Sequence, residues 1–175
     1  MPLLMLRDLP RYECLQEAAS ECPGMDVSAC EVFLNILRTG DAVSGSEAAF
    51  LAGHGLSQGR LIVLKLLAEA PEGSLRSSEL ADHAAVCRAT MTGLLDALER
   101  DGWVERATDP NDRRALRVKI TESGAALLKR AMPSYFAWIS KSLEVLTPKE
   151  RDQFVQLLRK TQQVFMDPAR NGECV

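Results

Sequence analysis

The sequence has few aromatic residues, no overall positive charge and no long apolar run. Aromatic side chains make up 5% of its 175 residues, too few for the stacking surfaces that bind single-stranded nucleic acid. The formal net charge is -3 at pH 7, so binding to nucleic acid requires a local basic patch. Even the apolar run LIVLKLLAEA contains Lys65, which argues against a membrane span.

Motifs for catalysis, metals and export are also missing. The five cysteines include no Cys-x-x-Cys pair, a pattern that fits reduced thiols better than a secreted disulfide framework. His54 and His83 are isolated, and we find no phosphate loop or nucleophile elbow. The start, MPLLMLRDLP, is too short an apolar run for a signal peptide. We therefore expect a cytoplasmic protein with no enzymatic activity, cofactor, metal or membrane.

Hydrophobic periodicity predicts a chain made mostly of helices. The predicted helices are a short one ending at Pro23, then 27–52, a third from the cap Ser57 through Leu67, 77–84, 88–101, 121–146, and a last one opened by the capping box of Thr147 and Glu150. Between the fifth and sixth helices, WVERAT and ALRVKI alternate like two strands joined by the turn DPNDRR. The order predicts a mainly α fold with a small β-wing, in which a winged helix-turn-helix lies between flanking helices.

The helix predicted over 88–101 has two unlike faces. Its apolar residues gather on one side, and the opposite side carries Ala89 and Gly93. A glycine within a helix costs about 1 kcal/mol relative to alanine, so one interpretation is that small residues let a partner approach closely. A DNA major groove admits such a helix, and Arg88, Thr90 and Thr92 offer donors there. The alternative is an ordinary solvated face.

The predicted hairpin is locally basic within an acidic chain. Between Arg100 and Lys119 lie six basic and four acidic residues. Arg113 and Arg114 fall at the hairpin tip, where an arginine can enter a narrow minor groove, and Asp112 is placed to hold one guanidinium extended. The alternative is a surface ion pair of little energetic value.

Two stretches resemble the MarR family of regulators. DRRALRVKITESG resembles that family's wing motif through Asp112, Arg114, Val118, Ile120, Thr121 and Gly124. ATMTGLLDALERDGWVER resembles its recognition helix and first wing strand. The resemblance extends from about Val27 to Phe165, which is nearly the whole chain outside the two ends.

The resemblance implies a homodimeric transcriptional regulator, expected to be a repressor, that grips a pseudo-palindromic site on double-stranded DNA with half-sites about 34 Å apart. A small, phenolic or aromatic-acid effector would release it. Arg114 with Asp112 would contact the minor groove, and Ser77, Ser78 and Arg60 would contact phosphates. The implied segments are an N-terminal arm (1–26), a dimerisation helix (27–56), the winged helix-turn-helix (57–120), C-terminal dimerisation helices (121–166) and a tail (167–175).

Two positions depart from the family pattern. Arg76 stands where a Ser or Thr commonly caps the short helix, so we expect Ser74 or Ser77 to cap it instead. Cys87 precedes the recognition helix in place of Ser or Thr, and we expect a weaker cap and a lowered thiol pKa there.

These cysteines leave a second interpretation open. A redox-sensing repressor could use Cys87 or Cys30, although we expect Cys30 to be a buried, inert thiol. We favour a simply tolerated small residue at Cys87, because no resolving cysteine lies nearby in the sequence. A winged-helix protein-interaction adaptor without DNA binding is the further alternative, but it has no need of a basic wing tip.

Overall fold

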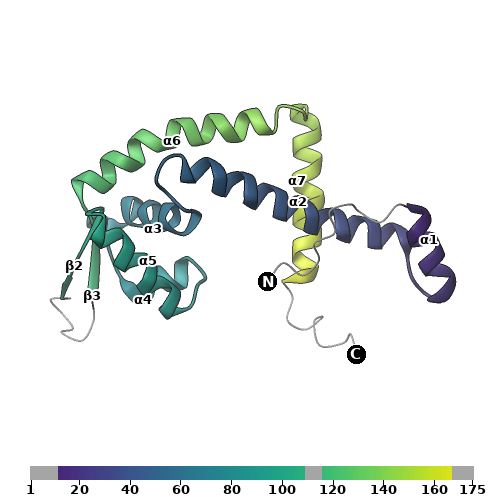
Figure 1. The fold of residues 1–175 in the computed structure, drawn as a ribbon, viewed down its shortest axis with the longest axis horizontal. Coiled ribbons are helices and arrows are strands. Elements are labelled where there is room, and N and C mark those ends of the chain that lie inside the picture. Colours follow the sequence, from purple (N-terminus) through teal and green to yellow (C-terminus); the bar gives the residue numbers. More distant parts are fainter. Residues whose placement is uncertain (1–11, 109–115, 167–175) are drawn as a thin grey trace. The chain divides into compact units, whose positions relative to one another are not determined.

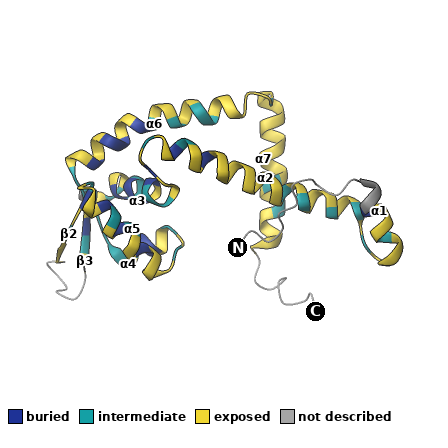
Figure 2. Cartoon of the chain, in the orientation of Figure 1, coloured by how far each residue is buried: buried dark blue, intermediate teal, exposed yellow. Residues whose placement is uncertain are grey.

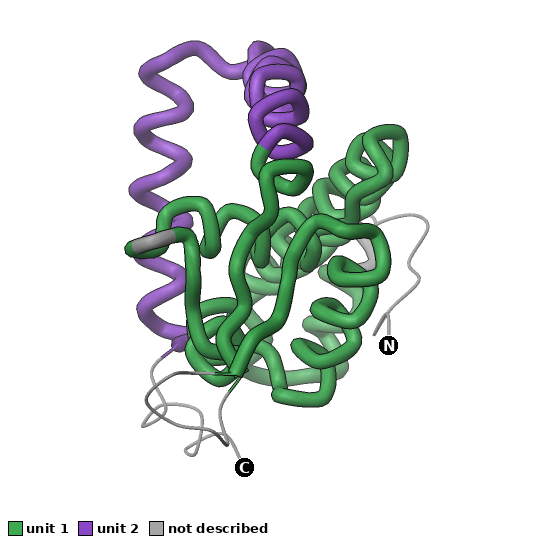
Figure 3. Tube along the Cα trace, turned by 90° about the vertical axis from the view of Figure 1, so that its left-hand side faces the viewer, with its two compact units in different colours: residues 1–125 green, residues 126–175 purple. Residues whose placement is uncertain are grey.

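Helices make up most of the molecule, and the only sheet among the described residues is small (Figure 1). The computed structural model describes residues 12–108 and 116–166. The chain forms two compact units, residues 1–125 and 126–175 (Figure 3). The mainly α fold with a β-wing is confirmed.

The elements follow the predicted order. In the first unit they are α1 (Tyr12–Glu21), α2 (Val27–Ala52), α3 (Gln58–Glu69), a 3-10 turn (Pro71–Gly73), β1 (Ser74–Arg76), α4 (Ser77–His83), α5 (Arg88–Arg100), β2 (Val104–Thr108) and β3 (Leu116–Ile120). Helix α6 (Glu122–Ser142) begins in the first unit and continues into the second, which also contains α7 (Pro148–Phe165).

Local capping explains where several helices begin. The Asp26 carboxylate accepts hydrogen bonds from the backbone N–H groups of Ser28 and Ala29 at the start of α2, and these bonds lower the pKa of Asp26. Ser57 accepts from the backbone of Arg60. At α7 the reciprocal bonds between Thr147 and Glu150 form the predicted capping box.

The sheet has one strand more than predicted. Its order is β1-β3-β2, with both pairings antiparallel. The two predicted wing strands are confirmed, but β1 was missed because it has only three residues, all half-buried. A strand this short shows no alternation between polar and apolar positions, and only its pairing with β3 reveals it.

The core of the first unit lies between α3, α4, α5 and the sheet (Figure 2). Its members are apolar side chains almost excluded from solvent: Leu61, Val63, Leu64, Leu67, Leu80, Ala81, Met91, Leu95, Leu98, Val104 and Val118. Burial of a large apolar side chain contributes about 1.5–3 kcal/mol. This shared core therefore holds the short helices and the hairpin together as one body.

The wing is tied to the start of α6 at its base. The Thr121 hydroxyl donates to the Gly102 carbonyl at 2.8 Å, and the Ser123 hydroxyl donates to the same oxygen at 2.7 Å. A Cβ at Gly124 would collide with the carbonyl oxygen of Trp103. The Thr-x-x-Gly part of the wing motif is thus explained by close approach between the two chain segments.

The second unit has little core of its own. Helix α6 runs through Pro133 and ends at Ser142, before the predicted limit. Tyr135 and Trp138 stack on it with ring centroids 6.0 Å apart. Helix α7 buries no residue in the single chain. Among the described residues, no helix is both long and apolar enough to cross a membrane.

Candidate nucleic-acid interface

Helix α5 presents a polar, small-residue face to solvent because its other face is locked into the core. Met91, Leu95 and Leu98 are at most 1% exposed. Ala89 and Gly93 are exposed on the opposite side, and nothing lies within 4 Å of where a Cβ on Gly93 would stand. The described chain therefore gives no packing reason for a glycine in this helix.

The first turn of α5 begins at Cys87, which is exposed and occupies the N-cap. Its Sγ lies 3.1 Å from the Thr90 hydroxyl oxygen and makes no capping bond to the backbone. The Thr90 hydroxyl is the main cause that lowers the pKa of Cys87, and backbone N–H groups add to it. The expected weak cap and the expected lowered pKa are both found. A redox role stays a prediction.

The turn between α4 and α5 contains an unusual backbone conformation. Ala85 has φ 53°, in the left-handed region that favours glycine. Its backbone N–H donates to the Asp82 carbonyl at 3.2 Å. The turn is therefore closed at a conformational cost, in the segment that sets the angle between the two helices.

The start of α4 is built differently from our prediction. Arg76 itself occupies the N-cap, and its backbone N–H donates to the Glu79 carboxylate at 2.7 Å. A guanidinium has no acceptor, so the helix lacks a side-chain cap. Ser74 accepts from Arg117, and Ser77 donates to the Leu116 carbonyl. The prediction that one of these serines caps α4 was wrong, because Arg76 holds the N-cap, Ser77 is already the first residue of the helix and Ser74 lies in β1.

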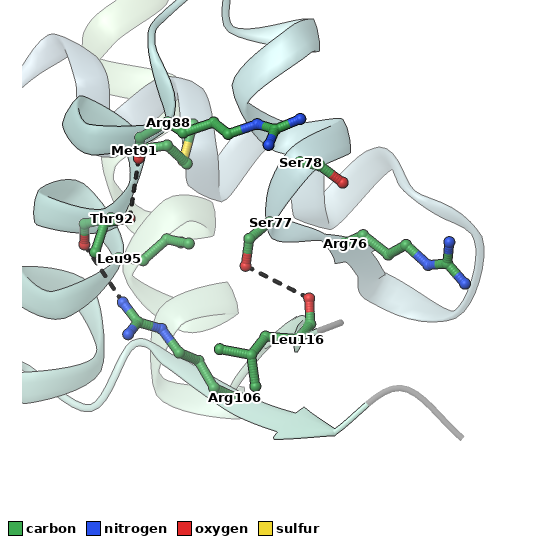
Figure 4. Close-up of a pocket in the computed structure, with 9 residues that line it drawn as sticks. All are labelled: Arg76, Ser77, Ser78, Arg88, Met91, Thr92, Leu95, Arg106 and Leu116. Atoms are coloured by element: carbon green, nitrogen blue, oxygen red, sulfur yellow. Dashed lines mark hydrogen bonds between the residues drawn. The ribbon is translucent and has the colours of Figure 1, made fainter. Parts of the chain in front are cut away.

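A pocket of about 430 Å³ lies between α4, α5 and the wing strands (Figure 4). It combines basic and hydroxyl groups with apolar side chains: Arg76, Ser77, Ser78, Arg88, Met91, Thr92, Leu95, Arg106 and Leu116. The structure thus brings four predicted DNA-contacting residues around one cavity, namely Ser77, Ser78, Arg88 and Thr92. The chemistry of the lining suits an anionic group attached to an apolar body.

One member of this lining was missed by sequence reasoning. Arg106 extends from β2 back to α5, where its Nη2 lies 2.7 Å from an Asp96 carboxylate oxygen. The same nitrogen donates to the Thr92 carbonyl at 3.4 Å. The sequence did offer an indication: Asp96 and Glu99 are one helical turn apart on α5, and two neighbouring carboxylates favour a basic partner such as Arg106.

The remaining predicted residues are placed as follows. Ala89 and Thr90 are exposed on α5. Arg60 lies outside the pocket, where its Nη1 is 2.9 Å from an Asp101 oxygen and its guanidinium is 5.6 Å from the centre of the Trp103 ring. Cys30 is half-buried rather than buried. The wing-tip residues Asp112, Arg113 and Arg114 lie outside the described residues, and their assignments stay predictions.

A short helix, a tight turn, a second helix with an exposed small-residue face and a β-hairpin define a winged helix-turn-helix, a class of nucleic-acid-binding domain. Comparison with known proteins narrows this class. A model of the MarR family matches residues 56–116. The HTH-type transcriptional repressor YetL of Bacillus subtilis is 35% identical over 153 residues, which are 87% of this chain and 92% of the repressor. The chain belongs to the MarR family.

Two further relatives support the assignment. The homoprotocatechuate degradative operon repressor of Escherichia coli is 29% identical over 125 residues, covering 71% of this chain and 83% of that protein. The crystal structure of Sco3205, a MarR family transcriptional regulator from Streptomyces coelicolor in complex with DNA, shares the fold with a TM-score of 0.74 and 22% identity, covering 83% of this chain and 92% of that one. These matches are to transcriptional regulators rather than enzymes.

Exchange of Gly93 for alanine separates folding from binding. We expect Gly93→Ala to raise the free energy of unfolding by about 0.5–1 kcal/mol, because alanine is the better helix former and the added Cβ meets no atom. The same methyl group should weaken DNA binding if the helix enters a groove closely. Urea unfolding and fluorescence anisotropy with labelled duplex DNA measure the two effects.

Gly45→Ala is the control for helix stability, since Gly45 also lies in a helix with open space around its Cβ in the single chain. It should stabilise the protein to a similar degree and leave DNA affinity unchanged. Because α2 is predicted to form part of the dimer, sedimentation velocity must show that this variant is still a dimer. A Gly93→Ala variant that binds DNA as tightly as the wild type would contradict a close approach at this face.

Proposed function

We propose that the protein is a homodimeric transcriptional repressor that binds a pseudo-palindromic site on double-stranded DNA and leaves it when a small aromatic acid binds. The observation that carries the proposal is the exposed face of α5, where small and donor-bearing residues stand opposite a fully buried apolar face. Membership of the MarR family supports the same role.

The proposed contacts fall into two groups. Arg88, Thr90 and Thr92 face the major groove from the first turns of α5, with Ala89 and Gly93 allowing the backbone to approach. Contacts to phosphate come from Ser77 and Ser78 on α4 and from Arg60, and the minor groove is reached by the arginines predicted at the wing tip. Phosphate contacts set the register of the protein, whereas base contacts set its sequence preference.

Salt dependence tests the proposal for DNA. We expect affinity for duplex DNA from upstream of the gene to fall steeply with salt concentration, because phosphate-bound counterions are released. Arg114→Ala should cost about 1–3 kcal/mol of binding and relax specificity at the bases it reads. Gel shift assays over a salt series measure both, and Lys141→Ala on α6 is the control that should bind normally. Absent or salt-insensitive binding would favour the protein-interaction adaptor.

The dimer is supported by the apolar residues that a single chain leaves uncovered. Phe154, Leu157 and Phe165 of α7 are 45%, 58% and 55% exposed and recur at helical spacing. On α2, Val32 and Phe33 are 54% and 46% exposed. Exposed apolar side chains repeated along one helix mark an interface, and a second copy of the chain is the partner that two-fold binding to a palindrome requires.

A charge on α7 should separate the subunits. We expect Leu157→Glu to shift the protein from dimer to monomer, because the carboxylate would be buried without a partner. Sedimentation velocity measures the change. Gln156→Glu adds the same charge on the opposite side of the helix and should leave the dimer intact. A wild-type protein that sediments as a monomer would refute the dimer proposal.

The effector is supported by the pocket beside α5. Arg88 contributes a guanidinium to its lining, and Met91, Leu95 and Leu116 supply apolar contacts (Figure 4). This combination fits a carboxylate on an aromatic ring. One relative is named as the repressor of a homoprotocatechuate degradative operon, and homoprotocatechuate is itself a phenolic acid.

Salicylate is a suitable probe for this pocket. We expect it to raise the melting temperature by an amount that grows with the logarithm of its concentration above Kd, as binding to the native state requires, and to release bound duplex DNA. Differential scanning fluorimetry and anisotropy measure the two responses. Benzyl alcohol, which lacks the carboxylate, is the control and should do neither. No change in melting temperature with salicylate would contradict an aromatic-acid effector.

A further inference from the structure

We propose that Arg106 is a positioning residue, whose guanidinium holds wing strand β2 against α5 and so sets the spacing between the two elements that read DNA. The inference rests on the proposed DNA-binding function and assigns a role to a residue that makes no predicted contact with bases.

The contacts of Arg106 extend along two turns of α5. Its Nη2 lies 2.7 Å from an Asp96 oxygen and donates to the Thr92 carbonyl at 3.4 Å. Its Nε lies 3.6 Å from a Glu99 oxygen. The planar guanidinium carries five N–H donors in a fixed fork, a geometry that the three rotatable donors of a lysine ammonium do not reproduce. One side chain of the wing therefore bonds to positions 92 and 96 of the helix, and its Nε lies within ion-pair distance of Glu99 without a hydrogen bond.

Burial distinguishes this network from an ordinary surface ion pair. The Arg106 side chain is only 18% exposed, whereas Asp96 and Glu99 are 59% and 43% exposed. A guanidinium already withdrawn from water loses little further hydration or freedom when it is held in place. Exposed pairs contribute little, but a half-buried guanidinium left without its carboxylates would be costly.

Strand pairing carries the effect to the whole hairpin. Arg106 stands opposite Val118 of β3, and Val118 is fully buried in the core. Both strands that lead to residues 109–115 are thus fixed at this level, one by the core and one by Arg106. Thr92, which Arg106 contacts on α5, is itself a predicted major-groove residue. The position of the wing and that of the reading helix are therefore coupled through one side chain.

The charge of Asp96 lets the two explanations predict opposite changes in DNA affinity. Asp96 is a negative charge on the helix proposed to face DNA, so by electrostatics alone its neutralisation should strengthen DNA binding. If Asp96 acts by holding Arg106, its neutralisation should instead weaken binding. Asp96→Asn therefore separates positioning from repulsion, and also from a direct contact between Arg106 and DNA, which would not need the carboxylate.

The experiment compares Asp96→Asn, Arg106→Gln and the double variant in the dimeric protein. The probe is a labelled duplex selected from a random library by the wild type. We expect each single variant to lose about tenfold in affinity for the duplex. The double variant should bind about as tightly as the single variant with the lower affinity, because both substitutions remove the same interaction. Glu105→Gln is the control for Asp96→Asn: it also removes one negative charge, from the residue next to Arg106 on β2, and it should not weaken binding.

Two readouts detect positioning rather than loss of stability. At saturating protein, hydroxyl-radical protection in the minor groove should weaken in Arg106→Gln while guanine N7 protection in the major groove persists. Without DNA, amides of β2 and β3 should exchange with deuterium about tenfold faster in that variant, and amides of α3 should be unchanged.

The outcomes are distinguishable. A wild type that selects no duplex refutes the proposed function, and the inference falls with it. If the wild type binds, Asp96→Asn affinity equal to or above that of the wild type overturns the inference while the proposed function stands. Unchanged amide exchange in β2 and β3 of Arg106→Gln, measured without DNA, also overturns the inference.

Discussion

The buried face of α5 is the constraint on which the rest of the DNA-binding unit depends. Met91, Leu95 and Leu98 are inserted into a core shared with α3, α4 and the wing strands, and each such side chain contributes about 1.5–3 kcal/mol by its burial. A rotation of the helix about its axis would expose these residues. Hydrophobic packing of the buried face therefore decides that the opposite face of α5, with Gly93, is turned to solvent.

Locally unfavourable residues collect around this helix. Ala85 holds a left-handed conformation before it, Cys87 caps it weakly and Gly93 weakens its middle. Each choice costs stability that a better helix former or cap would recover. Such departures are expected where function rather than folding selects the residue. Their concentration beside one exposed face agrees with a partner that approaches that face.

The wing connects this helix to the remainder of the chain. Arg106 links β2 to α5, and Thr121 and Ser123 link the other end of the hairpin to Gly102, at the turn that follows α5. Helix α6 begins at this second link and continues into the unit whose apolar surface is proposed to form the dimer. The same short hairpin thus borders both the DNA-reading helix and the helix leading to the interface.

The sequence by itself determined the elements, because periodicity and capping are local. Residues 27–52 were predicted as one helix with the observed limits, and the Thr147 capping box was read directly from its four residues. Exposure of Gly93 followed from its place opposite the apolar stripe. Tertiary structure alone decided what depends on residues distant in sequence. Strand β1 exists through its pairing with β3, the Ser77 hydroxyl bonds to the Leu116 carbonyl of β3, and Arg106 reaches its carboxylates only when the hairpin folds back onto α5.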